Sequence, residues 1–338
     1  MRIAKSTKTV YGLLLSGGLV FLSPSLAADD PWVVYEGGAG PGAGKHIVLV
    51  SGDDEYRSEE ALPQLGKILS VRHGFKCTVL FAIDPSSGEI KPNYQNNIPG
   101  LEALATADMM VLGLRFRELP DDKMKYFADF TNSGKPILGL RTSTHAFHIK
   151  NKESAYAKWD FRSEEWPGGW GQQVLGDTWV NHHGHHGKES TRGIINHLHG
   201  DHPIVRGAHD IWGDTDVYGI SHLPSDADVL VYGQVLVGMS PDDRPNHKKP
   251  LMPVVWVRSY TGTSGKPARI IATTMGAATD LRSEGLRRIL VNACYWGLGL
   301  EDWIAPESQV DLVGDYQPTT FGFGTFKKGV KPAAHALR

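Results

Sequence analysis

Histidines are concentrated in one short part of the sequence, where they could bind a metal ion or transfer protons. Residues 182–209 hold eight of the 15 histidines, and the densest stretch is Asn181-His-His-Gly-His-His-Gly187. Neutral imidazole binds zinc and similar ions, and its pKa near neutrality lets it accept and return a proton. We predict a site for a divalent metal, zinc or a similar ion, at His182, His183 and His186. The candidates for proton transfer are His145, His182 and His183.

The same stretch matches no established metal-binding motif. It has no H-E-x-x-H spacing and no cysteine nearby. The alternative is a solvated polar loop in which one or two histidines make only hydrogen bonds.

Three arginines directly follow or adjoin predicted strands. Arg57, Arg115 and Arg141 would meet at one edge of a parallel sheet. The planar guanidinium group suits a carboxylate, a phosphate or vicinal sugar hydroxyls. We predict that these arginines orient a substrate, and the alternative is a structural network with neighbouring acidic side chains.

Aromatic residues gather in residues 156–179, which show no regular periodicity. Flat aromatic faces at the mouth of a pocket suit the apolar faces of sugar rings. We predict that Trp170 and Tyr218 contact the substrate, and packing of a long loop against the core is the alternative.

Two familiar kinds of catalytic site are not supported by the sequence. Cys77 and Cys294 lie within a predicted strand and a predicted helix, and there is no G-x-S-x-G nucleophile motif. The glycine run at residues 36–45 precedes a strand, whereas a phosphate-binding loop follows one. We therefore predict no nucleophilic cysteine or serine and no nucleotide cofactor.

The elements that must position these residues alternate as in an α/β protein. Unbroken apolar runs separated by helical patterns predict a parallel sheet covered on both faces, interrupted by an irregular insertion rich in His and Trp. The predicted strands are 46–51, 77–82, 109–114, 136–140, 229–235, 254–257 and 269–274, and the helical segments are 62–71, 101–105, 121–132 and 284–298.

The first residues have the pattern of a secretory signal peptide. Basic residues precede an apolar run of about 12 residues, which is too short for a membrane span, and small residues follow it. We predict a signal peptide at 1–28, a flexible Gly-rich linker at 29–45, the α/β domain at 46–304 and a tail at 305–338. The protein would then be secreted or periplasmic, with no membrane attachment after cleavage.

The overall charge limits the choice of partners. The formal net charge is −2, with 35 basic and 37 acidic residues. Such a balance provides no general attraction for nucleic acid. A small carbohydrate is the predicted partner, and the sequence does not determine the oligomeric state.

Short motifs in residues 46–304 resemble the ThuA-like (trehalose-utilisation) family. They run in the family's order along the chain, and they are Ile47–Gly52, Leu119–Asp122, Gly134–Leu140, His202–Gly207, Asp216–Gly219, Pro253–Arg258, Thr273–Gly276 and Arg287–Trp296. The resemblance implies a class I glutamine amidotransferase-like fold, with a flavodoxin-like parallel sheet flanked by helices. It also implies a role in disaccharide or keto-sugar catabolism without the amidotransferase cysteine.

The resemblance also reveals a difference in the metal site. Some relatives bind a metal through histidines whose matching positions here are Ser58, Arg115, Arg141 and Ala277. We therefore expect an arginine-lined pocket, unless His145 and residues 182–186 rebuild a metal site.

These expectations lead to one main hypothesis and two alternatives. The main hypothesis is a secreted protein acting on a sugar or keto-sugar at the carboxyl edge of the sheet, by proton transfer, elimination or isomerisation. The alternatives are a carbohydrate-binding or scaffold protein without catalysis, and a metal-dependent hydrolase that uses the His cluster.

Overall fold

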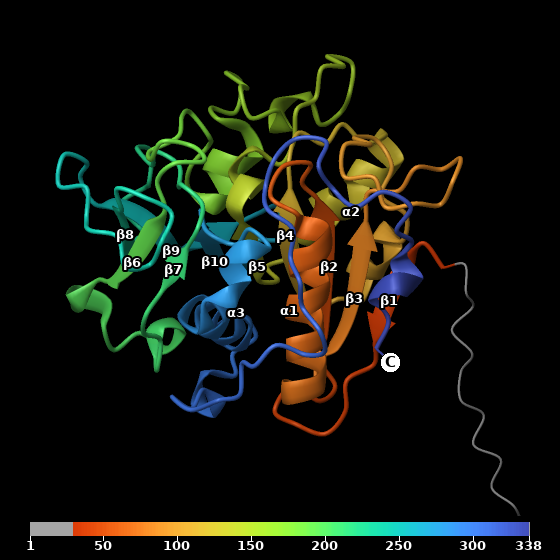
Figure 1. The fold of residues 1–338 in the computed structure, drawn as a ribbon. Coiled ribbons are helices and arrows are strands. Elements are labelled where there is room, and N and C mark those ends of the chain that lie inside the picture. Colours follow the sequence, from red (N-terminus) through yellow and green to blue (C-terminus); the bar gives the residue numbers. More distant parts are fainter. Residues whose placement is uncertain (1–29, 338) are drawn as a thin grey trace, which may run out of the picture.

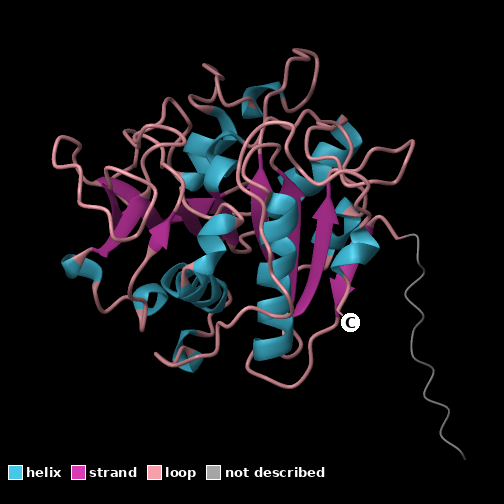
Figure 2. Cartoon of the chain, viewed as in Figure 1, coloured by secondary structure: helices cyan, strands magenta, loops and turns pink. Residues whose placement is uncertain are grey.

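Five strands of almost unbroken apolar sequence form the parallel half of the sheet. The computed structural model describes residues 30–337, and Figures 1 and 2 show the arrangement of their elements. The parallel strands lie in the order β3-β2-β4-β5-β10. Their bounds are β2 His46–Gly52, β3 Lys76–Phe81, β4 Met109–Leu114, β5 Ile137–Leu140 and β10 Pro267–Thr273.

The other five strands run antiparallel to their neighbours, so the prediction of a parallel sheet is wrong for this half. β9 and β10 are joined by the short connection 262–266, and such a hairpin requires antiparallel pairing. The antiparallel strands are β1 Trp32–Tyr35, β6 Thr191–Ile195, β7 Trp212–Gly213, β8 Asp228–Val235 and β9 Met252–Thr261.

The main helices contribute to two buried clusters. Leu62 of α1 (Ser58–His73) and Leu286 of α3 (Glu284–Gly297) join Leu49 of β2 in one cluster. Phe127 of α2 (Asp121–Thr131) joins Val50 of β2 in the other. Alternate residues of β2 therefore belong to different clusters, as expected for a strand buried on both faces.

The segment predicted as a flexible linker is built into the fold. Its residues Trp32–Tyr35 form β1, which pairs with β3. Gly37 has a φ of 76°, and a Cβ there would lie 2.4 Å from the Gly74 carbonyl oxygen. Glycine is required at this close approach. The glycine content of this segment therefore does not imply that the segment is flexible. The predicted signal peptide lies outside the described residues.

The C-terminal segment after residue 304 runs along the outside of the molecule. In Figure 1 it climbs past α1, crosses above the ends of the strands and descends beside β1. The Tyr316 hydroxyl donates to the Ala278 carbonyl, and the Tyr35 hydroxyl donates to the His335 carbonyl. Within residues 30–337, no helix is long and apolar enough to cross a membrane.

Candidate functional site

The loop after β2 provides an acidic and an aromatic side chain at the carboxyl edge of the sheet. Buried Asp53 organises this loop by accepting hydrogen bonds from the backbone N–H groups of Glu55 and Tyr56. The Thr142 hydroxyl, which follows β5, donates to the same carboxylate. Asp53 therefore fixes the positions of Glu55 and Tyr56 relative to the end of β5.

The turn after β5 buries an arginine. Arg141 has a φ of 50°, a left-handed conformation that is uncommon for a residue with a side chain. A sharp turn from strand to helix presents the nucleophile in some hydrolases. Here the turn instead places the Arg141 guanidinium 3.7 Å from the centre of the Tyr56 ring and 5.0 Å from that of Tyr218.

Arg141 is only partly satisfied by hydrogen bonds. Its Nη1 donates to the Thr274 carbonyl over 2.6 Å, and its Nη2 lies 3.9 Å from Asp216 Oδ1. Nε and Nη2 make no hydrogen bond to any described residue. The buried positive charge of Arg141 therefore lies close to the Asp216 carboxylate.

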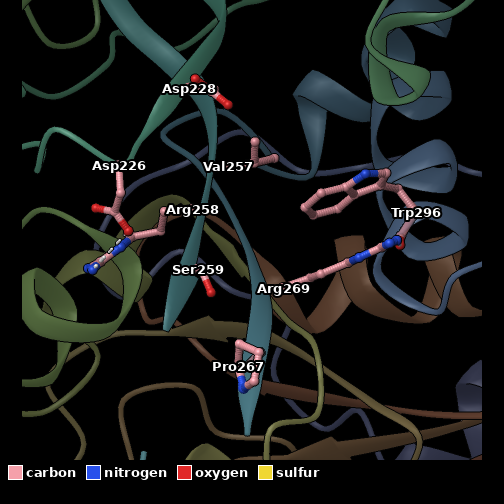
Figure 3. A pocket seen from close by; sticks show the side chains of 9 residues that line it. Asp226, Asp228, Val257, Arg258, Ser259, Pro267, Arg269 and Trp296 are labelled. Carbon is pink, nitrogen blue, oxygen red and sulfur yellow. Dashed lines mark hydrogen bonds and ion pairs between the residues drawn. The ribbon is translucent and has the colours of Figure 1, made fainter. Parts of the chain in front are cut away.

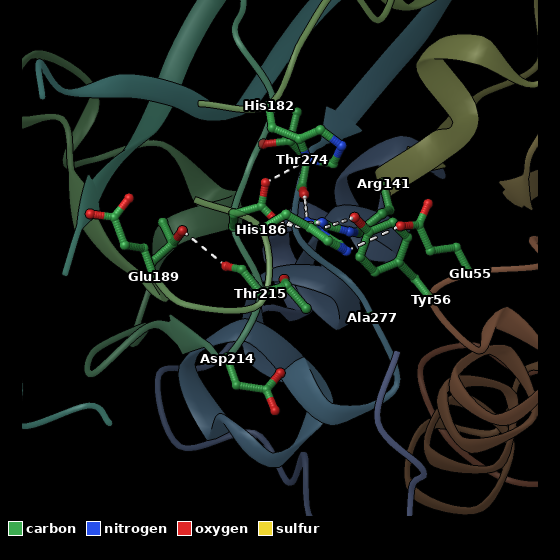
Figure 4. Close-up of polar contacts among 12 residues, drawn as sticks. Glu55, Tyr56, Arg141, His182, His186, Glu189, Asp214, Thr215, Thr274 and Ala277 are labelled. Atoms are coloured by element: carbon green, nitrogen blue, oxygen red, sulfur yellow. Dashed lines mark hydrogen bonds and ion pairs between the residues drawn. The ribbon is translucent and has the colours of Figure 1, made fainter. Parts of the chain in front are cut away.

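Asp216 joins two histidines of the His-rich loop. Figure 4 shows these two histidines, His182 and His186, near Arg141. His182 pairs with Tyr218 in a short antiparallel bridge, which brings the loop beside Asp216. His182 Nδ1 lies 2.6 Å from Asp216 Oδ2, and His186 Nδ1 lies 2.9 Å from Asp216 Oδ1. Because a carboxylate can only accept, both Nδ1 atoms donate, and each Nε2 is directed elsewhere.

The carboxylate is fully buried, whereas 33% of the His182 side chain and 38% of the His186 side chain are exposed. Burial alone would raise the pKa of Asp216. The hydrogen bond from His182 and the charge of Arg141 outweigh burial, so the pKa is lowered. Asp216 is therefore ionised at neutral pH and can stabilise positive charge on either imidazole.

Glu55 links this cluster to a second arginine. His186 Nε2 lies 3.4 Å from Glu55 Oε1, and Arg115 Nε lies 3.5 Å from Glu55 Oε2. Arg115 also donates from Nη1 to Asp54 over 3.0 Å. Burial raises the pKa of Glu55, and the nearby carboxylate of Asp53 adds to this effect.

Aromatic rings surround the polar cluster. The Trp179 ring lies 6.0 Å from His182 and 5.5 Å from His145, measured between ring centres. His145 also packs edge-on against Tyr218. It is 3% exposed, and burial lowers its pKa well below the usual value, so it is neutral at pH 7.

Two of the predicted residues lie away from the cluster. His183 is directed to the Pro250 carbonyl, 2.9 Å from its Nε2. Trp170 is fully buried and donates from Nε1 to the Thr131 hydroxyl of α2, so it has no free face for a ligand. The irregular sequence around Trp170 suggested an exposed loop, but this loop packs into the core.

The three arginines predicted to orient a substrate have different surroundings. Arg57 is buried, and its Nη2 donates to the Gly322 carbonyl and the Thr325 hydroxyl of the C-terminal segment. Arg141 is buried next to Asp216. Arg115 is the one with an exposed part, 16% of its side chain, and so is the arginine best placed to contact a ligand.

A hollow of about 390 Å³ lies elsewhere, along β9 and β10 (Figure 3). Its charged residues already have partners: Arg258 pairs with Asp226 and Arg269 with Glu301. The Trp296 ring contacts the Arg269 guanidinium and the His202 ring. We place the candidate site at the His182 cluster because it combines two of the sequence-predicted histidines with partly exposed titratable groups.

Comparison with known proteins gives structural likeness only. No model of a protein family and no curated protein matches the sequence. A "putative ThuA-like protein" from Parabacteroides merdae matches 87% of this chain and 99% of its own, with a TM-score of 0.49 and 12% identity. Another from Bacteroides uniformis matches 76% and 91%, with a TM-score of 0.46 and 14% identity. The chain is similar to ThuA-like proteins.

A glutaminase domain is also among the similar structures. The domain of Trypanosoma brucei CTPS, solved with acivicin, matches 74% of this chain and 94% of its own, with a TM-score of 0.32 and 11% identity. What the site can do must come from its own residues.

Three residues of the site were not singled out from the sequence. Asp216 begins Asp216–Gly219, one of the motifs on which the sequence resemblance is based, so its place in the sequence offered a signal. Glu55 follows a predicted strand in an acidic run, which was considered only as a partner of the arginines. Phe321, whose ring lies 4.9 Å from that of His186, comes from the C-terminal segment, and nothing in its local sequence indicated this contact.

Proposed function

We propose that this chain binds a sugar or keto-sugar at the His182 cluster and catalyses a proton transfer, of elimination or isomerisation type. The observation that carries the proposal is the pair of imidazoles held by one buried, ionised carboxylate. In this arrangement His182 Nε2 can take a proton from a carbon next to a keto group. Asp216 then stabilises the imidazolium that forms.

The surroundings support the same chemistry. Arg115 can stabilise negative charge that develops on the keto oxygen, and the aromatic rings suit the apolar face of a sugar. We also interpret the order β3-β2-β4-β5-β10, with helices on both faces, as a flavodoxin-like arrangement. Ligands in such sheets bind beyond the carboxyl ends of the strands, where this cluster lies.

The test is exchange of the proton next to the keto group in D₂O, followed by ¹H NMR. The substrates are methyl α-D-glucopyranoside, as a negative control, and its keto derivatives. We expect wild-type protein to exchange the proton, and His182→Ala and Asp216→Asn to slow exchange about 100-fold or more. His183→Ala is the matched control, because His183 belongs to the same loop but faces Pro250.

Two results would contradict the proposal. One is wild-type protein that leaves every keto substrate unchanged. The other is His182→Ala protein that exchanges as fast as wild type. If sugars bind but no proton exchanges, the non-catalytic carbohydrate-binding function is supported instead.

One further observation favours a metal-dependent hydrolase as a second candidate. His182, His186 and Asp216 each offer a ligand atom, and these atoms lie within 4.8 Å of one another. Two imidazoles and a carboxylate suit zinc and other divalent transition metals, so the donor set fits. A bound ion would polarise a sugar oxygen or lower the pKa of a bound water. Here Asp216 takes the place that the sequence analysis gave to His183.

Elemental mass spectrometry of untagged protein, dialysed against a weak chelator, separates the two candidates. About one equivalent of metal, lost in His182→Ala and retained in His183→Ala, supports the metal site. Protein without metal that still exchanges the proton supports the first candidate.

The proposed location is outside the cytoplasm. It depends on the signal-peptide pattern of residues 1–28. The mass of the mature protein, isolated from the medium or periplasm of an expressing bacterium, tests it. A processed protein beginning near residue 28 is the expected result.

A further inference from the structure

The C-terminal segment places two phenylalanines on the candidate site. The Phe321 ring stacks on the Tyr56 ring, with 5.6 Å between centres and 29° between planes. Phe323 lies beside Arg115, whose guanidinium carbon is 4.8 Å from the centre of the ring. The two rings thus contact two different parts of the site.

The backbone between these rings is held from both sides. The Gly322 N–H donates to the Glu55 carbonyl over 2.8 Å. The buried Arg57 guanidinium donates to the Gly322 carbonyl and to the Thr325 hydroxyl. This part of the segment is therefore anchored to the loop that supplies Glu55 and Tyr56.

Phe323 nevertheless keeps most of its ring surface in solvent. Its exposed fraction is 59%, whereas the Arg115 side chain beneath it is 16% exposed. Phe116 contacts the same guanidinium at 4.3 Å. The Arg115 guanidinium thus contacts both rings, and its contact with Phe323 helps to hold that ring while most of the ring surface stays free.

A continuous series of contacts connects this ring to His186, which shares Asp216 with His182. Arg115 contacts Glu55, and Glu55 contacts His186 Nε2. The carboxylates of Asp54 and Glu55 flank the guanidinium. An aromatic face beside carboxylates and a guanidinium matches a sugar, which has an apolar face and a rim of hydroxyl groups.

We propose that Phe323 is the stacking platform for the sugar ring, with the carboxylate of Asp54 as a partner of its hydroxyl groups. The C-terminal segment is then part of the binding site. This inference depends on the proposed function and adds the position at which the sugar binds. Phe321 serves a separate purpose, since it packs against Tyr56 and His186 and keeps them in place.

Binding of methyl α-D-glucopyranoside and its keto derivatives, measured by saturation-transfer NMR titration, tests the platform. We expect Phe323→Ala to weaken binding about tenfold, and Phe323→Trp to retain it. Trp303→Ala is the matched control, because Trp303 is 61% exposed but lies in the 3₁₀ turn Glu301–Trp303 after α3. Circular dichroism and melting curves check that each variant is folded.

The outcomes separate this inference from the function on which it depends. If wild-type protein binds these sugars and Phe323→Ala binds them equally well, the platform is wrong while the proposed function stands. If wild-type protein binds none of them, both are overturned. If binding depends on Phe323 but no proton exchanges, the platform stands and the catalytic part of the proposed function fails.

Discussion

Asp216 is the residue on which the chemistry of the candidate site depends, because its carboxylate accepts hydrogen bonds from both histidines. We expect Asp216→Asn to lower the free energy of unfolding by about 1.5–3 kcal/mol at pH 7, the usual contribution of hydrogen bonds to a charged group. The native pKa lies below the ordinary 3.8, so the contribution is present above pH 4 and is lost as pH falls through the native pKa. Urea unfolding at pH 7 and pH 3 measures it, with exposed Asp302→Asn as the control. An equal difference from wild type at both pH values would contradict this account.

His145 packs among aromatic rings, and its burial keeps it neutral. Its native pKa is lowered by burial, whereas the unfolded chain takes up a proton near pH 6.5. Wild-type stability should therefore fall as pH drops below 6.5, since protonation favours the unfolded chain. We expect His145→Phe to lose less stability than wild type between pH 7.5 and pH 5.5 in urea titrations. Exposed His197→Gln should behave like wild type, and an identical loss in wild type and His145→Phe would refute the idea.

At the scale of elements, sequence patterns predict which segments form strands better than they predict the direction in which the strands run. Apolar runs predicted most strands of the sheet, because a strand buried on both faces must be apolar throughout. They did not predict that β8 and β9 run antiparallel, since direction depends on connections rather than on the strand's own residues. Trp170 illustrates the same limit, because Thr131, whose hydroxyl accepts its hydrogen bond, is distant in sequence.

The site was predictable to a similar extent. The strand ends and the His-rich loop were visible as local features, which is why His182 and His186 were selected. The choice between His183 and Asp216 could not be made locally. It depends on the bridge between His182 and Tyr218, a pairing of segments more than 30 residues apart.

The turn that carries Arg141 and His145 is supported by close contact with a neighbouring helical turn. Gly171 begins the turn Gly171–Leu175, and a Cβ there would lie 1.9 Å from the Thr144 carbonyl oxygen. We expect Gly171→Ala to destabilise the protein by about 1–3 kcal/mol, because the backbone must move apart. Thermal unfolding measures the effect. Gly38→Ala is the control, since a Cβ there meets nothing within 4 Å, and equal melting temperatures for the two variants would contradict the contact.

At the scale of the whole molecule, the C-terminal segment connects the candidate site to the edge of the sheet. Its ring contacts include Phe321 on Tyr56 and His335 on Phe81, the latter with ring centres 5.5 Å apart. Such contacts between distant segments are not encoded in any local pattern. The tail predicted at 305–338 therefore supplies side chains both to the site and to the surface beside β1 and β3.

Removal of this segment tests whether the fold depends on it. A chain ending at residue 314 loses these contacts and exposes Tyr35, Tyr56 and Phe81. Burial of several apolar side chains, less the entropy of ordering the segment, leaves a net loss of about 2–4 kcal/mol. We expect a melting temperature lower by about 5–10 °C in calorimetry. A chain ending at residue 336 keeps the contacts and should melt like the full chain. If the shorter chain also melts like the full chain, the segment contributes side chains to the site without stabilising the fold.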